Sequence, residues 1–293
     1  MNIPGPIVLV LALALPTLGT AAQISSEGEP MRSVRDGDFM FSFLPKSLQR
    51  NPIIDMTVNT EVTNYGRLMR PVSPESPMYY VAAPSGFKQL GAALYGEKSP
   101  PVTELERAMK KSLATTGYVE STLPEHPPTL AVIYYWGSHN KLDPETAANF
   151  PDLAARYQLE RAVLVGGKKY SSNLARALEY GAGPEDRSND REYLRYQSAD
   201  DLYFVVASAY DYAALSRGQR KLVWRTTMTA NATGVNMKDS IVPLIATAGP
   251  YFGKETVDPQ IAARKVSREG RVEIGESKVI NDPAPEIPAN KQP

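Results

Sequence analysis

The chain of 293 residues contains no cysteine, so neither disulfide bonds nor zinc bound by thiolates can hold its fold together. Such a chain must be stabilised by the burial of apolar side chains alone. The roughly 190 residues from Met78 to Lys265 are enough for one domain of this kind. The absence of cysteine also excludes a cysteine nucleophile.

Residues 1–22 have the pattern of a secretory signal peptide. An apolar run over residues 7–15 precedes Pro16 and a stretch of small residues, and cleavage is expected after Ala21 or Ala22. The run is shorter than the about 20 residues of a permanent membrane helix. No Lys or Arg precedes it, so a buried N-terminal strand or helix is the alternative interpretation. We expect a periplasmic or secreted protein without a membrane span after cleavage.

The formal charge of the chain is balanced, with 32 basic and 32 acidic residues, none of them in residues 1–22. Nucleic acids and anionic membrane surfaces attract proteins that carry concentrated positive charge. Neither is therefore an expected partner.

Proline-rich stretches divide the chain into segments. Residues 23–77 are expected to form an N-terminal arm or linker that ends in three closely spaced prolines, and residues 53–62 within it alternate weakly, as a strand or an ordered arm would. Residues 78–265 are expected to form a single domain. Residues 266–293 are expected to form a short hairpin and a disordered tail.

The first half of the domain alternates between strand and helix patterns. Apolar spacing predicts a helix over residues 103–117, with Thr103 and Glu106 as a capping box and Gly117 at its end. Strands are predicted over residues 78–83 and 130–136.

The second half begins with a helical insertion over residues 143–200, which Gly166 and Gly167 divide into pieces. Strands over 202–215 and 221–233 follow, joined by a hairpin turn at 216–219. A second amphipathic helix is predicted over 237–248, where Pro243 is tolerable only near the first turn.

This order of elements favours an α+β fold, a two-layer sandwich of a mostly antiparallel sheet, two amphipathic helices and the helical insertion. Helices and strands do not alternate regularly enough for a doubly wound parallel sheet.

Residues 78–253 resemble a family of uncharacterised bacterial envelope domains, mostly lipoproteins, that is catalogued as a domain of unknown function. The resemblance lies in the helix over 103–117, the strand over 130–136, the stretch Leu222-Val223-Trp224-Arg225 and a closing helix up to Gly253. The architecture is similar to the N-terminal domain of TolB. The chain lacks the lipid-acceptor cysteine of the family and carries the insertion 143–200, and the family implies no catalytic residues.

His139 is the sharpest candidate for a catalytic residue, because it follows a predicted strand and has Asp143 and Glu145 close behind it. These three residues could act in acid–base catalysis. The competing interpretation is that Asp143 caps a helix that begins at Pro144. With only two histidines and no cysteine, no metal site or cofactor is expected.

Sixteen tyrosines outnumber seven phenylalanines, and Tyr134, Tyr135 and Trp136 form one aromatic cluster. Tyrosines on a sheet can form a binding face for protein or carbohydrate. A partly wet sheet face under the helical insertion is the competing interpretation.

These observations favour an exported, non-enzymatic envelope or secreted protein that binds a protein partner or a surface polymer. The alternative function is a carboxylate-dependent hydrolase that acts on carbohydrate or peptidoglycan. The apolar residues of the insertion also suggest a homodimer formed through it.

Overall fold

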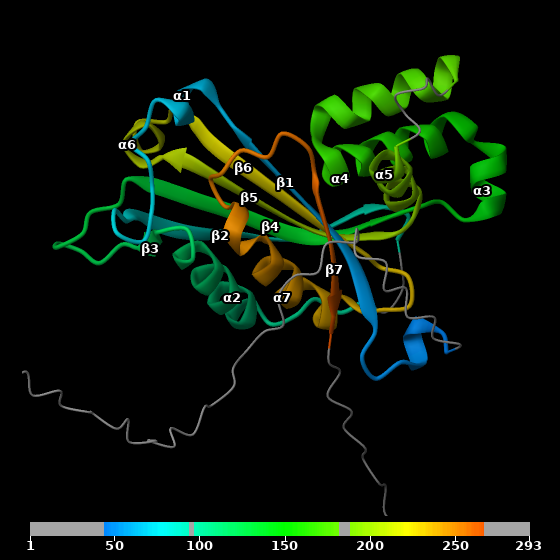
Figure 1. The fold of residues 1–293 in the computed structure, drawn as a ribbon, viewed down its shortest axis with the longest axis horizontal. Helices are drawn as coiled ribbons and strands as arrows, with labels where there is room; N and C mark the ends of the chain where they lie inside the picture. Colours follow the sequence, from blue (N-terminus) through cyan, green and yellow to red (C-terminus); the bar gives the residue numbers. More distant parts are fainter. Residues whose placement is uncertain (1–43, 94–96, 182–187, 267–293) are drawn as a thin grey trace, which may run out of the picture. The chain divides into compact units, whose positions relative to one another are not determined.

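The computed structural model describes residues 44–93, 97–181 and 188–266, which form an α+β fold around one seven-stranded sheet (Figure 1). The strand order is β3-β2-β4-β5-β6-β1-β7. The strands are β1 (Ile53–Val62), β2 (Met78–Gly91), β3 (Tyr118–Glu120), β4 (Leu130–Asn140), β5 (Leu202–Asp211), β6 (Leu222–Asn231) and β7 (Gln260–Lys265).

Most neighbouring strands run antiparallel, as the sequence predicts. β2 is parallel to β3 and to β4, whereas the pairs from β4 to β7 are all antiparallel. The two predicted strands over 202–215 and 221–233 do pair in this way as β5 and β6. Their connection is not a simple turn, because the short helix α6 (Tyr212–Ser216) lies within it.

Two helices cover one face of the sheet, α2 (Val102–Ala114) and α7 (Met237–Ala248), and they contact each other (Figure 1). Strand alternation directs every second side chain toward them. Met56 of β1, Val132 of β4 and Val205 of β5 are fully buried in this core, together with Leu113 of α2 and Ile241 of α7. The main core therefore lies between the sheet and this pair of helices.

The helical insertion forms α3 (Pro144–Asn149), α4 (Pro151–Tyr180) and α5 (Asn189–Ala199), as predicted. α4 contacts β1 and β6, and a second small core joins Val165, Leu194 and Leu202. The two predicted glycines do interrupt the helix, because Gly167 has the non-helical angles φ 76° and ψ −177°.

β1 belongs to the sheet itself. Residues 53–62, for which a strand or an ordered arm was expected, pair with β6 on one side and with β7 on the other. The sheet therefore includes a strand upstream of the expected domain boundary at Met78. Alternation in these residues is weak because both faces are covered, and Met56, Thr57 and Val58 are all buried.

Two predicted details of the helices are wrong. α2 begins at Val102, and its N-cap residue is Pro101, whose side chain makes no capping hydrogen bond. Thr103 therefore lies inside the helix, and the predicted capping box of Thr103 and Glu106 does not form. Pro243 is the seventh residue of α7 rather than a first-turn residue. The helix tolerates it because Ile241, Leu244 and neighbouring side chains are fully buried against the core.

β2 extends further than its predicted end at residue 83. Its continuation to Gly91 pairs with β4 across a register shift between Pro84 and Phe87. β3 pairs only with residues 78–80, so the rest of this strand lies at the edge of the sheet. The expected signal peptide lies outside the described residues, and so do all but the first residue of the segment 266–293, for which a short hairpin and a tail are expected.

Candidate functional site

His139 lies on β4 but is closed off by the helical insertion. Its side chain is fully buried, Nε2 lies 3.2 Å from Oε2 of Glu160, and its ring contacts the edge of Tyr157. The partner of this histidine thus comes from α4 and not from Asp143 or Glu145. A base must reach the proton that it removes, and this ring has no surface exposed to solvent.

Burial lowers the pKa of His139, and the positive charge of Arg161 acts in the same direction. The hydrogen bond to Glu160 opposes the shift without reversing it. The imidazole is therefore neutral at pH 7 and helps to join the sheet to α4.

Asp143 is the N-cap of α3, as the competing interpretation predicts. Oδ1 accepts a hydrogen bond of 2.9 Å from the backbone N–H of Thr146. Hydrogen bonds from the Thr146 side chain and backbone lower the pKa of Asp143. Glu145 lies in the first turn of the same helix and is exposed. The structure does not bring His139, Asp143 and Glu145 together as one site.

The aromatic cluster of β4 is divided between the two faces of the sheet. Tyr134 and Trp136 are buried on the side of α2 and α7. Tyr135 points the opposite way, where Lys88 Nζ lies 4.1 Å from its ring centroid and Phe204 meets it edge-on. Because strand side chains alternate, these three consecutive residues do not form one binding face.

Within the described ranges, no group of three or more histidine, aspartate or glutamate side chains is arranged to hold a metal ion. In the same ranges, no helix combines the length and the apolar character that crossing a membrane would require. The insertion exposes Phe150, Val163 and Leu178, and homodimerisation through it stays a prediction.

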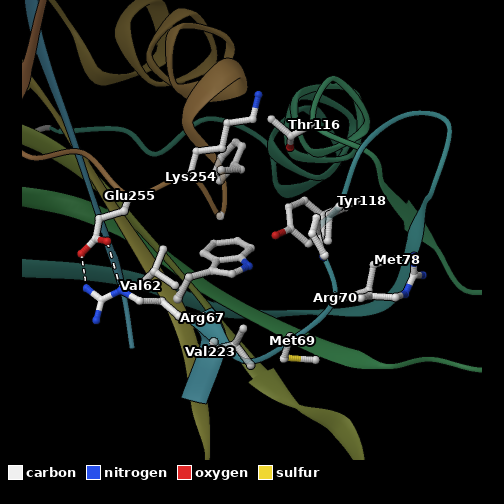
Figure 2. A pocket seen from close by; sticks show the side chains of 16 residues that line it. Val62, Arg67, Met69, Arg70, Met78, Thr116, Tyr118, Val223, Lys254 and Glu255 are labelled. Carbon is white, nitrogen blue, oxygen red and sulfur yellow. Dashed lines mark hydrogen bonds and ion pairs between the residues drawn. The ribbon is translucent and has the colours of Figure 1, made fainter. Parts of the chain in front are cut away.

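A cavity of about 300 Å³ lies where the C-terminal end of β1 meets the N-terminal end of β6 (Figure 2). We call it the Trp224 pocket. It is lined by α1 (Asn64–Arg67), the loop after α1, the starts of β2 and β3, and the segment that follows the short helix η3 (Gly249–Tyr251). Its lining residues are Val62, Gly66, Arg67, Met69, Arg70, Pro71, Val72, Met78, Thr116, Tyr118, Val223, Trp224, Phe252, Gly253, Lys254 and Glu255.

Three aromatic rings form the buried part of this pocket. The ring of Trp224 lies 5.5 Å from that of Tyr118 and 5.9 Å from that of Phe252, measured between centroids. Trp224 is only 1% exposed, and no hydrogen-bond partner is found for its Nε1 among the described residues. A buried donor without an acceptor costs free energy and is uncommon in folded proteins.

The Tyr118 hydroxyl lies close to the backbone of Gly253. A β-carbon at this glycine, whose φ is +69°, would stand 2.0 Å from that oxygen. Burial raises the pKa of Tyr118 to about 12, and the neighbouring indole N–H of Trp224 opposes the shift, although it does not reach hydrogen-bonding geometry. Tyr118 is therefore a neutral hydroxyl at physiological pH.

Positive charge exceeds negative charge around the pocket. The lining contains three cations, Arg67, Arg70 and Lys254, and one carboxylate, Glu255. Arg67 binds Glu255 through Nε and Nη2, and this hydrogen-bonded pair lies at one side of the pocket in Figure 2. The hydrogen bond between them raises the pKa of Arg67 and lowers that of Glu255.

No pattern in the sequence indicates this pocket. Arg67 and Arg70 fall within the segment expected to be a linker, and Trp224 was noted only for the family resemblance. The lining residues come from five separate parts of the chain, and no local motif joins them. The pairing of β1 with β6 places Val62 opposite Trp224, and the other lining residues come from elements beside this pair.

No protein-family model matches the chain, and no curated protein matches it. One solved structure, a PDZ domain protein from Parabacteroides distasonis, aligns with a TM-score of 0.34 and 11% identity. The alignment covers 73% of this chain and 40% of that one, so the chain spans less than half the length of that protein.

Proposed function

We propose that the protein is exported and binds a partner, a protein or a polymer of the cell envelope, through the Trp224 pocket. The observation that carries the proposal is the composition of the pocket, in which a floor of three buried aromatic rings lies beneath a rim of excess positive charge. Concave sites that combine apolar walls with a few polar groups are the usual form of a binding site.

The chemistry around the pocket favours binding over catalysis. Its only carboxylate, Glu255, is held by Arg67, and both histidines of the chain lie outside it. The pattern of residues 1–22 supports the proposed export. A cavity of about 300 Å³ lies at the small end of the range for ligand sites, which suits one anchoring group of a larger partner.

Site-specific photocrosslinking in living cells tests this proposal. A photoreactive amino acid replaces Met69, which lines the pocket, and in a matched control it replaces the exposed Leu178 of α4. We expect a discrete adduct from position 69 that is absent from position 178 and that weakens when Arg67→Gln is added. No adduct from position 69, or the same adducts from both positions, would contradict the proposal. N-terminal sequencing of the mature protein tests export separately.

A further inference from the structure

In the Trp224 pocket, Arg67 already binds a carboxylate of the chain itself, the side chain of Glu255. Nε of Arg67 lies 3.2 Å from Oε2 of Glu255, and Nη2 donates to Oε1 of the same side chain. This two-pronged arrangement is the geometry in which guanidinium groups recognise carboxylates. Arg67 is thus positioned for a carboxylate group in particular.

The pair is also replaceable. Its side chains are 50% and 45% exposed for Arg67 and Glu255, so water reaches both. An ion pair of this exposure contributes little to stability. A carboxylate from outside can therefore take the place of Glu255 at a small net cost, while Glu255 returns to solvent.

The other two cations leave the pocket favourable for an anion. The Arg70 guanidinium donates to neutral oxygens, the carbonyls of Ser76 and Pro77 and the Ser76 hydroxyl, none of which compensates its charge. Lys254 is adjacent to Glu255 in sequence, and no ion pair is found for it among the described residues. A bound anion would lie within the field of all three cations.

The remaining walls favour an apolar group. Val62, Met69, Val72 and Met78 line the cavity together with the aromatic floor. A ligand that consisted only of a small hydrated anion would leave these walls in contact with water. A ligand with an apolar body would remove them from water, at a gain of about 25 cal/mol for each Å² buried.

We infer that the Trp224 pocket binds a small carboxylic acid with an apolar body, whose carboxylate replaces Glu255 on Arg67. This inference rests on the proposed function, since it names the chemistry that the same pocket recognises. The acid is either a free molecule or the end of a larger partner.

Calorimetric titration of the full mature chain tests the inference. 3-Phenylpropionate is compared with its neutral analogue 3-phenylpropanamide, and we expect the acid to bind roughly tenfold more tightly, the effect of a charged hydrogen bond. A short acetylated peptide that ends in phenylalanine provides the second arm. Tighter binding of the peptide than of the free acid identifies an acid displayed on a partner, and the reverse order identifies a free acid.

Two variants locate the site and separate it from general charge effects. Glu255→Gln should tighten binding of 3-phenylpropionate about two- to fivefold, because it removes the competing carboxylate. Glu120→Gln, which breaks the comparably exposed Lys110–Glu120 pair outside the pocket, should leave the affinity unchanged. Arg67→Gln should weaken binding roughly tenfold, and a thermal melt checks that it is folded.

Three results would overturn the inference. The first is equal affinity for 3-phenylpropionate and its amide, and the second is no saturable binding of 3-phenylpropionate or of the peptide. The third is an equal change in affinity from Glu255→Gln and Glu120→Gln. If one of these results is found but the photocrosslinker at position 69 still forms its specific adduct, the inferred carboxylic acid is wrong and the proposed function stands. If the adduct is also absent, both fail.

Discussion

The break in α4 at Gly167 gives a sharp test of how the helical insertion is attached to the sheet. Its angles, φ 76° and ψ −177°, lie in a region that is almost exclusive to glycine. Any other residue at this position costs about 1–3 kcal/mol in backbone strain. A β-carbon would also stand 2.8 Å from Nδ2 of Asn59 and 2.9 Å from Oε1 of Glu61 on β1.

Moving these two side chains adds to the cost of Gly167→Ala. Asn59 is 7% exposed and its Oδ1 accepts a hydrogen bond from Thr256, so its displacement costs about 1 kcal/mol for the bond that is lost. The expected total is therefore about 2–4 kcal/mol of the free energy of unfolding. Urea unfolding followed by circular dichroism measures it.

Gly181→Ala is the matched control. Gly181 has similar backbone angles, φ 85° and ψ 156°, but its β-carbon would meet no atom of the described residues within 4 Å. We expect Gly167→Ala to cost at least about 1 kcal/mol more than Gly181→Ala. A cost for Gly167→Ala equal to or below that of the control would refute the reasoning.

Three further predictions follow from buried or capping groups. Burial lowers the pKa of His139, so below the ordinary histidine pKa of about 6.5 the unfolded chain binds more protons than the folded chain, and the free energy of unfolding should fall as the pH drops below that value. The midpoint of urea unfolding should fall less over the same pH range in His139→Gln than in the unchanged protein. Thr57→Val should cost about 1–3 kcal/mol, because it leaves the buried hydroxyl of Thr229 without its partner at 2.5 Å. Adding Thr229→Val should recover part of that loss in a double-mutant cycle, and a purely additive result would contradict this pairing. Asp143→Ala should cost about 1 kcal/mol in thermal melts through loss of the α3 cap, whereas a similar loss in Glu145→Ala would argue against capping.

The sequence predicts most elements that depend on local patterns. The break at Gly166 and Gly167, the antiparallel pairing of β5 with β6 and the helix over 237–248 are all confirmed. Each depends on spacing within a few residues, where hydrophobic periodicity and glycine preferences act directly.

The parts that could not be predicted depend on distant partners. Residues 53–62 alternate too weakly to be identified as a strand inside a sheet, because burial on both faces removes the polar half of the pattern. The Trp224 pocket requires Arg67, Tyr118 and Glu255 to meet, although no short motif contains them. The cluster Tyr134 to Trp136 shows the opposite error, since residues adjacent in sequence face opposite sides of the sheet.

The position of β1 determines when the domain can finish folding. β1 lies between β6 and β7 in the sheet. Thr57 of β1 contacts Thr229 of β6, and these two residues are 172 positions apart in sequence. β1 is the first strand in the described part of the chain, and it has no complete place in the sheet until nearly all of the described residues have been made. Contacts of such long range slow folding, because the entropy of closing the loop is lost before the pairing compensates it. The chain should remain incompletely folded throughout its synthesis, and removal of β7 should leave β1 with one exposed edge in an otherwise complete sheet.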